Sequence, residues 1–561
     1  MELSGTEIII ECLKQEKVKV IFGIPGAAIM PLYDTFGKIG KLPFENILTR
    51  HEQGAIHAAD GYARATGEVG VCVVTSGPGA TNLVTGLANA HLDSVPLVAF
   101  TGQVSTNLVG NDAFQEVDIT GITLPITKNN YIARRVEDLA AIIKEAFYVA
   151  RSGRPGPVLI DLPKDVQLAK CRFKYPEKVS RKGYKPSYKG HTRQVKSAAQ
   201  KIMEANKPVI IAGGGVINSN ASGVLQKIAT KVDIPVVTTF MGIGSFPESH
   251  SLSLGMLGMY GQYIANQATS NADLIIALGT RFDDRITGNL SQFCPHAEII
   301  HIDIDPAEIG KNIAVKIPIV GDLKNILHQL NGYLGEKKNP SWLREIEKIR
   351  EKVSCPQVDK NEVLKPKYII KCINESFKGE AIIVTDVGQH QMWAANYCQF
   401  IHPRTFISSG GLGTMGYGLP AAIGAKMGSP DKTVVCISGD GSFQMNIQEL
   451  ATAIYNRLPI IVILMNNGYL GMVRQLQELF CERRYVSTSL AGSPDFIKIV
   501  EGYGGVGYKV DKKEEFYPIL EKAVQMNQFV LIDCHIPQEE NTFPMVQPGS
   551  SINQMMGVDQ S

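Results

Sequence analysis

Short apolar runs rich in β-branched residues recur along the chain, and each ends in Gly, Asp or Asn before a segment with helical periodicity. Runs of this kind that alternate with helices are typical of parallel sheets in α/β domains. We therefore expect an α/β protein with doubly wound parallel sheets. The predicted strands are residues 71–75, 97–100, 158–160, 209–212, 274–278, 299–304, 382–385, 434–437 and 460–465.

Two stretches interrupt this pattern. Residues 164–190 are rich in Lys, Arg, Pro and Tyr, and residues 335–366 hold a short charged helix between Pro340 and Pro356. Both are typical of connections between domains. Because 561 residues exceed what one hydrophobic core usually serves, we predict three α/β domains and a polar tail. Their predicted bounds are residues 1–170, 188–340, 363–540 and 541–561.

Composition excludes several functional classes. Hydrophobic residues make up 44% and charged residues 20% of the chain, as in ordinary globular proteins. A net charge of +2 provides no basic footprint for nucleic acid or anionic lipid. The sequence has no apolar run of about 18 residues, and Ser4 and Glu7 have the capping-box spacing of a folded helix rather than the pattern of a signal peptide. We therefore expect a cytoplasmic protein without a membrane or nucleic-acid partner.

The ten cysteines are scattered and form no C-x-x-C pair. This distribution fits neither a zinc site nor a disulfide framework. We expect the cysteines to be reduced and mostly structural.

Two polar clusters follow predicted strands of the third domain. One is Gly439-Asp440-Gly441-Ser442, and the other contains Asn467. The carboxyl ends of parallel strands are where ligands bind in such sheets. Glycines would let the backbone approach a diphosphate, while the Asp440 carboxylate and the Asn467 amide offer oxygen ligands for Mg²⁺. By itself, a Gly-Asp-Gly segment is a weak signal and is more often a simple strand-to-turn connection.

The spacing of the two clusters is more specific. G-D-G, 24 intervening residues and then N-N resembles the signature of thiamine-diphosphate enzymes. The resemblance implies three such domains, which bind the pyrimidine, FAD and the diphosphate in chain order. It assigns Mg²⁺ to Asp440, Asn467 and the carbonyl group of Tyr469. With the similar segments 386–393, 410–416 and 470–476, it also implies thiamine-diphosphate contacts by Gly388, Gln389, His390, Gly413, Met415, Gly439, Gly441, Ser442, Gly471 and Met472.

The first domain extends the resemblance. Residues 50–64 are similar to the family segment R-H-E-x-x-A-x-x-x-A-D/E-G-Y-A-R, in which Glu52 would protonate the pyrimidine ring of the cofactor. Considered alone, Glu52 could equally be a carboxylate at the start of a helix. Pro78 and Asn82 belong to a G-P-G-x-x-N turn that would lie beside the pyrimidine. In this family the first and third domains reach the cofactor from different subunits, which implies a homodimer with active sites at its interface.

Further segments resemble acetohydroxyacid (acetolactate) synthases. Residues 112–116 read D-A-F-Q-E, whose Phe114 and Gln115 would line the reaction pocket. The segments S-G-R-P-G-P-V and P-K-D place Arg154 near the flavin and Lys164 at the channel mouth. In G-x-R-F-D-D-R, Arg285 would hold the carboxylate of the acceptor keto acid, a role that suits a guanidinium group. The tail, residues 541–549, also resembles the closing segment of this family.

Five segments of the second domain resemble FAD contacts of the biosynthetic enzymes of this family. Because the reaction is not a redox reaction, the resemblance implies a largely structural flavin. The implied FAD-contacting residues are Arg154, Gly213, Gly214, Gly215, Thr239, Phe240, Leu257, Gly258, Met259, Gly279, Arg281, Asp283, Arg285, Asp303, Ile304 and Asp322.

One position departs from the family pattern. Leu476 stands where many family members have tryptophan, a residue that favours 2-ketobutyrate over pyruvate. A methylene group is worth roughly 1–3 kcal/mol of discrimination in an apolar pocket. We therefore expect Leu476 to weaken the preference for 2-ketobutyrate.

The implied reaction begins with decarboxylation of pyruvate on thiamine diphosphate, started by Glu52. The hydroxyethyl carbanion then condenses with a second 2-keto acid, positioned by Gln115 and Arg285. Pyruvate would give 2-acetolactate and 2-ketobutyrate would give 2-aceto-2-hydroxybutyrate, in the biosynthesis of valine, leucine and isoleucine. The resemblance also implies a separate regulatory small subunit, and it leaves open whether dimers pair into tetramers.

Two alternatives share parts of this sequence pattern. A pyruvate oxidase or another carboligase on the same scaffold would share the cofactor motifs, but should not combine Phe114 and Gln115 with Arg285. A non-catalytic paralogue should have lost Glu52 or Asp440, and both are present.

Overall fold

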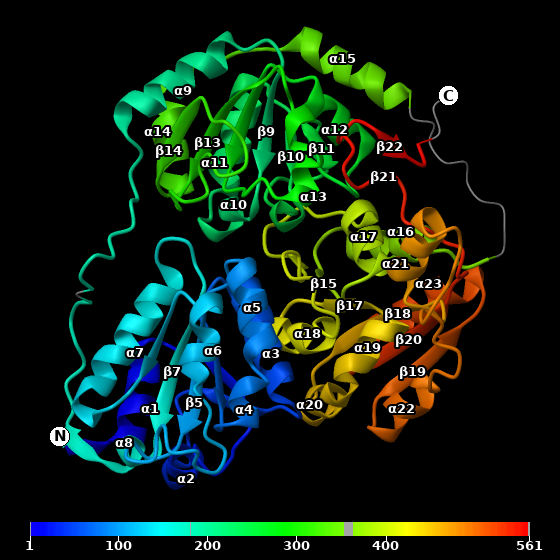
Figure 1. Cartoon of the computed structure of the whole chain (residues 1–561). Helices are drawn as coiled ribbons and strands as arrows, with labels where there is room; N and C mark the ends of the chain where they lie inside the picture. The colour runs from blue at the N-terminus through cyan, green and yellow to red at the C-terminus, as the bar shows by residue number, and fades with distance from the viewer. Residues whose placement is uncertain (1, 180, 353–362, 559–561) are drawn as a thin grey trace.

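Three α/β units, each built around a six-stranded parallel sheet, make up the chain (Figure 1). The structure is a computed structural model that describes residues 2–179, 181–352 and 363–558. The central unit, in green, lies above the other two in Figure 1, and the N-terminal and C-terminal units lie side by side below it. The predicted fold class, α/β with three doubly wound parallel sheets, is confirmed.

The N-terminal sheet has the strand order β3-β2-β4-β5-β7-β6. A two-stranded antiparallel ribbon of β1 and β8 closes the unit at its N-terminus. The strands are β1 (Glu2–Ser4), β2 (Val20–Gly23), β3 (Glu45–Leu48), β4 (Gly70–Val74), β5 (Leu97–Gln103), β6 (Asn129–Ile132), β7 (Pro157–Pro163) and β8 (Lys170–Arg172). The helices are α1 (Gly5–Gln15), α2 (Met30–Ile39), α3 (Glu52–Thr66), α4 (Pro78–Thr81), α5 (Val84–Leu92), α6 (Ile119–Thr123), η1 (Leu124–Ile126), α7 (Val136–Arg151) and α8 (Lys164–Leu168).

The central sheet has the order β11-β10-β9-β12-β13-β14. Its strands are β9 (Pro208–Ala212), β10 (Val236–Thr238), β11 (Ser253–Met256), β12 (Leu274–Leu278), β13 (Glu298–Asp303) and β14 (Ile317–Val320). The helices of this unit are α9 (Thr192–Glu204), α10 (Gly214–Asn218), α11 (Ser222–Val232), η2 (Phe240–Gly242), α12 (Tyr263–Ser270), α13 (Asp284–Thr287), η3 (Leu290–Gln292), α14 (Leu323–Tyr333) and α15 (Pro340–Glu351).

The C-terminal sheet has the order β16-β15-β17-β18-β20-β19. Its strands are β15 (Ile382–Thr385), β16 (Phe406–Ile407), β17 (Val434–Gly439), β18 (Ile460–Asn466), β19 (Val506–Val510) and β20 (Val530–His535). The helices are α16 (Pro366–Phe377), α17 (Gln389–Tyr397), α18 (Gly418–Gly428), α19 (Asp440–Phe443), η4 (Gln444–Glu449), α20 (Leu450–Tyr455), α21 (Gly471–Phe480), α22 (Phe496–Gly502) and α23 (Lys513–Gln525).

Helices α3 and α18 join the N-terminal and C-terminal units. A Cβ added at Gly61 of α3 would lie 2.1 Å from the Ala421 carbonyl oxygen, and one added at Gly424 of α18 would lie 1.8 Å from the Ala58 carbonyl oxygen. The two backbones can approach this closely only because both positions are glycine. One hydrophobic cluster continues through both units, so α3 is held firmly against the C-terminal unit.

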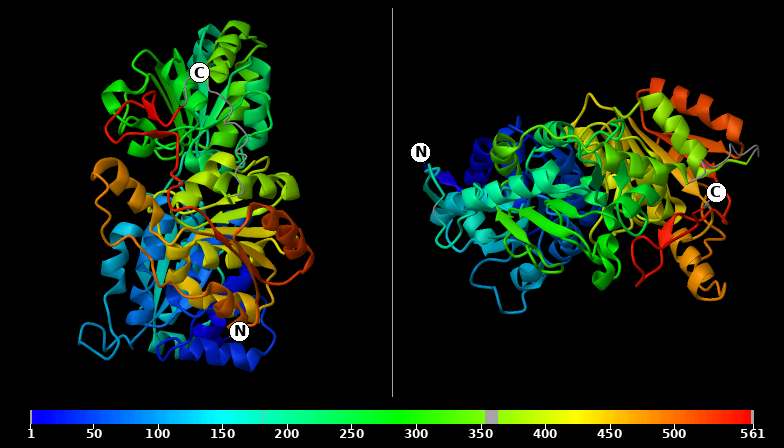
Figure 2. Two further views of the ribbon diagram at one scale, coloured as in Figure 1. Left: turned by 90° about the vertical axis from the view of Figure 1, so that its right-hand side faces the viewer. Right: turned by 90° about the horizontal axis from the view of Figure 1, so that it is seen from above.

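The tail that follows β20 crosses to the central unit (Figure 2, red). It contains β21 (Met545–Val546) and β22 (Met555–Met556), which pair antiparallel. The Val546 N–H donates to the Met259 carbonyl group (2.7 Å), and the Asn266 amide donates to the Ile552 carbonyl group (2.9 Å). These bonds fasten the tail to the side of the central unit.

Each of the nine predicted strands is present, with ends that differ by at most three residues. The capping box at Ser4 and the charged helix after Pro340 are also confirmed. The interpretation of residues 164–190 as a connection throughout is wrong for its first part, because α8 and β8 belong to the N-terminal unit. Residues 353–362, part of the second predicted connection, lie outside the described residues. The domain bounds stay a prediction.

Candidate active site and cofactor cavity

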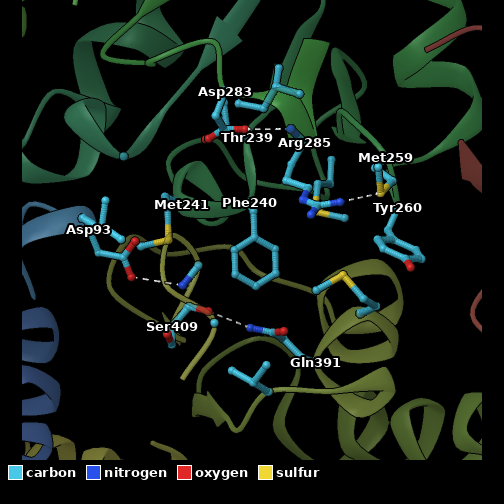
Figure 3. Close-up of a pocket in the computed structure, with 18 of the residues that line it drawn as sticks. Asp93, Thr239, Phe240, Met241, Met259, Tyr260, Asp283, Arg285, Gln391 and Ser409 are labelled. Carbon is cyan, nitrogen blue, oxygen red and sulfur yellow. Dashed lines mark hydrogen bonds between the residues drawn. The ribbon is translucent and has the colours of Figure 1, made fainter. Parts of the chain in front are cut away.

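A cavity of about 930 Å³ lies between the central and C-terminal units (Figure 3). The carboxyl ends of strands from both sheets open into it, which is the usual ligand position in parallel sheets. The predicted site residues that line it are Arg154, Gly214, Gly215, Thr239, Phe240, Leu257, Met259, Gly279, Arg281, Asp283, Arg285, Asp303, Ile304, Asp322, Gly388, Gln389, His390, Gly413, Met415, Gly439, Asp440, Gly441, Ser442, Asn467, Tyr469, Gly471, Met472 and Leu476.

Asp440 and Asn467 lie at the same edge of the C-terminal sheet. Strands β17 and β18 are neighbours, with Gly439 opposite Met465, so the residues that follow them are brought together. Asp440 is only 1% exposed, and its Oδ2 has no hydrogen-bond partner among the described residues. Burial raises the pKa of Asp440 to about 6, against the opposing effect of backbone N–H groups. A buried, unpartnered carboxylate oxygen beside an amide fits a Mg²⁺ site.

Glycines let the side chains of His390 and Gln389 pack close to the backbone beside this carboxylate. A Cβ added at Gly439 would lie 2.8 Å from His390 Nδ1, and one at Gly471 would lie 2.1 Å from Gln389 Oε1. Burial lowers the pKa of His390 to about 3, so this imidazole is neutral, and its Nε2 has no partner among the described residues. The floor of the cavity therefore consists of backbone and neutral polar groups. Such a surface fits a diphosphate that is bound through a metal ion.

Asp386 holds the turn that carries Met415. Its Oδ1 accepts the N–H groups of Val387 (2.8 Å) and Gly416 (2.9 Å), and its Oδ2 accepts that of Gly418 (3.1 Å). Met415 Cε lies 3.9 Å from the position of a Cβ at Gly441. The thioether therefore extends over the Gly-Asp-Gly turn, as expected of an apolar residue that contacts the cofactor.

The upper part of the cavity is lined by both polar and apolar groups. Arg154 reaches it from the N-terminal unit, where its Nη1 contacts Glu308 (2.5 Å) and Asp305 (3.4 Å) and its Nε donates to Ser94 (2.8 Å). Burial raises the pKa of Asp303 to about 6. These groups, with Phe240 and Leu257 on the same wall, fit FAD in chemical character.

Two predicted flavin residues lie behind the cavity wall rather than in it. Gly213 packs against the Gly279 carbonyl oxygen, which would be 2.2 Å from an added Cβ. Gly258 has φ +117° and lies beneath the Arg285 carbonyl oxygen. Both shape the wall through the backbone, since larger side chains would displace the neighbouring Gly279 and Arg285 backbone.

Arg285 is one of the residues that line the cavity, as Figure 3 shows. Its side chain is 68% exposed, with Nε 3.6 Å from Asp284 and Nη1 3.2 Å from the Met259 sulfur. Leu476, on α21, lines the same cavity and is 38% exposed. The guanidinium group is therefore available to an anion that enters past an apolar wall.

Glu52 lies in a second cluster, in the N-terminal unit. It is the first residue of α3, and its Oε2 accepts the Asn82 side-chain amide (2.9 Å). The interpretation of Glu52 as a residue at a helix start is thus also correct. From the C-terminal unit, Glu449 Oε1 accepts the N–H groups of Arg50 and His51, both at 3.0 Å. Glu449 therefore anchors the segment that presents Glu52.

The remaining predicted residues of the N-terminal unit lie in the same region. Pro78 begins α4, Gln115 has φ +58° and packs against Gly77, and Lys164 begins α8 at the end of β7. Phe114 is 86% exposed. With Glu52 and Asn82, they do not line the cavity of their own chain. One chain therefore presents the predicted site as two separate halves.

Several residues of the site were not predicted. Asp93 lines the cavity, as does the tail from Met545 to Gly549, and Gln475 accepts a hydrogen bond from the cavity residue Gln389. Glu449 supports the separate segment that presents Glu52. The tail resembles a family segment, but that resemblance implies no role for its residues. Glu449 carries no local sequence signal, because its contacts are with backbone almost 400 positions away.

In the part of the chain that the structure describes, no helix has both the length and the apolar character needed to span a bilayer. Among the same residues there is no cluster of three His, Cys, Asp or Glu side chains suited to a metal. The nine described cysteines are all free and seven of them are buried, and Cys355 lies outside the described residues. This agrees with the expectation of reduced, mostly structural thiols.

Comparison with known proteins places this geometry in a family. Residues 3–122, 195–330 and 386–534 match the N-terminal TPP binding domain, the central domain and the C-terminal TPP binding domain of thiamine pyrophosphate enzymes. Similar curated proteins include the acetolactate synthase large subunit of Haemophilus influenzae, with 45% identity over 99% of this chain and 98% of the relative. The acetolactate synthase isozyme 3 large subunit of Escherichia coli has the same identity and coverage. Acetolactate synthase of Mycobacterium leprae is 49% identical over 98% of this chain and 90% of the relative.

The matches run through all three units and include both halves of the site. Identity at this level over nearly the whole length of both chains shows common descent and a common fold. The protein therefore belongs to the thiamine pyrophosphate enzymes and, within them, to the family of acetolactate synthase large subunits.

Proposed function

We propose that the protein decarboxylates pyruvate and condenses the two-carbon unit with a second 2-keto acid, as an acetolactate synthase. The observation that carries this proposal is its 45–49% identity to acetolactate synthases along almost the entire chain. The cavity supports it, because a buried carboxylate for Mg²⁺ and an exposed Arg285 for a carboxylate substrate open into the same space.

Thiamine diphosphate, when bound, supplies the electron sink for the decarboxylated carbon. Asp440, Asn467 and the Tyr469 carbonyl group would hold Mg²⁺, and Gly441 and Ser442 would contact the diphosphate. The unpartnered Asp440 Oδ2 supports this assignment, since a cation would satisfy it. Gly388, Gln389, His390, Gly413, Met415, Gly439, Gly471 and Met472 complete the proposed contacts.

Two subunits would complete each active site. Glu52, Pro78, Asn82, Phe114, Gln115 and Lys164 do not line the cavity of their own chain. In a homodimer, Glu52 of one subunit would protonate the pyrimidine ring held in the cavity of the other, and Gln115 would face the acceptor held by Arg285. The bond from Asn82 to Glu52 would keep that carboxyl group oriented toward the ring.

The acceptor would bind between Arg285 and Leu476. Arg285 offers a bidentate donor for the keto-acid carboxylate, and the apolar wall beside it would exclude water from the new carbon–carbon bond. Leu476 leaves more room than an indole, so pyruvate would compete well with 2-ketobutyrate. The names of the Haemophilus influenzae and Escherichia coli relatives include the words large subunit, and we propose a separate regulatory subunit for this chain.

FAD would occupy the upper part of the cavity with a largely structural role. Arg154, Asp303 and Asp322 provide its polar partners and Phe240 and Leu257 its apolar wall, with Gly214 and Gly215 at the strand end and Gly213 behind them. The reaction needs no electron transfer to this flavin. A cytoplasmic location stays a prediction from the sequence.

The test is to incubate the purified protein with pyruvate, Mg²⁺ and thiamine diphosphate, with and without FAD, and to measure acetolactate and oxygen. Acetolactate without oxygen consumption is expected. Oxygen consumption in step with pyruvate would instead indicate a pyruvate oxidase. Glu52→Gln should abolish most activity, while Glu45→Gln, an exposed glutamate of the same unit, should leave it unchanged. An inactive wild-type protein that binds all three cofactors would favour a non-catalytic paralogue.

A further inference from the structure

A buried polar network from the N-terminal unit contacts the turn that carries Gly413 and Met415. The turn, residues 409–417, belongs to the C-terminal unit and borders the cavity. Asp93, directly after α5, reaches it from the N-terminal unit, as Figure 3 shows. Its Oδ2 accepts the Gly410 N–H (3.0 Å) and its Oδ1 accepts the Gly411 N–H (2.7 Å). One carboxylate thus binds two successive peptide groups of the turn.

Arg64 also binds the Asp93 carboxylate and so fixes its orientation. Arg64 Nη2 donates to Asp93 Oδ2 (2.8 Å), and Arg64 Nε donates to Asp60 Oδ1 (2.6 Å). Asp60 also accepts the Tyr417 hydroxyl group (2.6 Å), at the far end of the turn. The side chains of Asp60, Asp93 and Arg64 are at most 10% exposed, so solvent does little to weaken these charge-assisted bonds.

Asn89, a residue of α5, binds the start and the middle of the turn. Asn89 Oδ1 accepts the Ser409 hydroxyl group (2.5 Å) and the Thr414 hydroxyl group (3.4 Å). The Ser409 hydroxyl in turn accepts the Thr414 N–H (2.8 Å). The N-terminal unit therefore holds the turn at its start, its middle and its end, with Gly413 and Met415 between these points.

We propose that Asp93 is a positioning residue for thiamine-diphosphate binding, because its carboxylate sets the distance of the Gly413–Met415 turn from the Gly-Asp-Gly segment. The proposal rests on the proposed function for the identity of the ligand. Asp93 does not touch the proposed Mg²⁺ ligands, and none of the roles assigned above involves it. Its effect on the cofactor passes through the Gly410 and Gly411 peptide groups, which an amide in place of the carboxylate cannot both satisfy.

The test is the thiamine-diphosphate affinity of Asp93→Asn, measured by titration calorimetry in Mg²⁺ on the folded, FAD-saturated protein. The dissociation constant should rise at least about tenfold, consistent with the loss of about one charge-assisted bond. Asp93→Glu, which keeps the carboxylate, should recover part of the affinity. Glu248→Gln is the matched control: Glu248 is a partly buried carboxylate that accepts the Phe400 N–H (2.9 Å) between units but lies outside the cavity.

A second variant covers the case in which Asp93→Asn does not fold. Ser409→Ala removes the bonds to Asn89 and Thr414 from the same turn, and should weaken thiamine-diphosphate binding by about threefold. A dissociation constant within twofold of the wild type in the folded variants would overturn the proposal, as would a loss of FAD affinity alone. If the wild-type protein does not bind thiamine diphosphate at all, the proposed function fails instead.

Discussion

Replacing Asp440 by asparagine should stabilise the metal-free protein while it abolishes the response to Mg²⁺. In the folded chain the carboxylate is buried with Oδ2 unpartnered, and its pKa is raised from 3.8 to about 6. That difference corresponds to about 3 kcal/mol against the charged form at neutral pH. Asparagine removes the charge but leaves an unpaired amide, which costs about 1 kcal/mol. We expect a net gain of about 2 kcal/mol for Asp440→Asn in EDTA at pH 8.

Asp386→Asn is the control that separates an unpaired carboxylate from a paired one. Burial also raises the pKa of Asp386 to about 6, but its two oxygens accept the N–H groups of Val387, Gly416 and Gly418. An amide nitrogen would face at least one of these donors, so this variant should lose about 1–3 kcal/mol. The two substitutions therefore change stability in opposite directions although they remove equally buried charges.

The assay is urea unfolding monitored by tryptophan fluorescence, because Trp393 of the C-terminal unit lines the cavity. In EDTA the midpoint of Asp440→Asn should exceed that of the wild type by about 0.5–1 M. Addition of Mg²⁺ and thiamine diphosphate should raise the wild-type midpoint only. A lower midpoint for Asp440→Asn than for the wild type in EDTA would refute the reasoning, because the carboxylate would then be satisfied without a metal.

Three further predictions concern the acceptor, the flavin and pH. Leu476→Trp should raise the preference for 2-ketobutyrate over pyruvate by about 5- to 150-fold in a competition assay of the two products; a change below twofold would exclude a role for this position. Arg154→Met leaves the buried Glu308 and the nearby Asp305 without their guanidinium partner and should raise the FAD dissociation constant by at least about tenfold, measured from flavin absorbance after gel filtration; full flavin retention would contradict this. Burial raises the pKa of Glu248 from 4.5 to about 7, so its contribution to stability is complete below pH 4.5 and lost as the pH rises through 7. Glu248→Gln should therefore exceed the wild type in stability by about 3 kcal/mol at pH 8 and match it at pH 4.5, and parallel pH profiles of the two unfolding curves would show the argument to be wrong.

Much of the fold could be read from the sequence because buried parallel strands are continuous apolar runs. The strands at residues 274–278 and 382–385 were predicted with the bounds that the structure has. Edge strands such as β3 and β6 were missed, since most of their residues are exposed or only partly buried and they lack such a run. The interpretation of residues 164–190 as a connection was wrong for α8 and β8. Strand β8 pairs with β1, about 170 positions earlier, and a local sequence pattern cannot indicate a pairing between such distant segments.

The candidate site also has some features that the sequence predicts and others that only the folded structure reveals. Asp440 and Asn467 could be placed together from sequence, because each follows a strand and parallel strands end at one edge. The separation of Glu52 from their cavity could not be inferred from spacing and follows from the packing of α3 against α18. Asp93 and Glu449 have no motif, since what they bind is backbone N–H, which every residue except proline carries.

By itself, the sequence determined the α/β class, most central strands and the residues suited to cofactor chemistry, because hydrophobic runs and short motifs act locally. Only the tertiary structure decided which of these residues share a cavity and which carboxylates have partners. Asp440 and Asp386 are both aspartates that follow a buried strand, yet one has an unpartnered oxygen and the other accepts three peptide N–H groups. The difference arises because the N–H groups bound by Asp386 come from chain segments that lie beside it only in the folded protein. Whether a buried carboxylate has hydrogen-bond partners therefore depends on tertiary packing rather than on residue type.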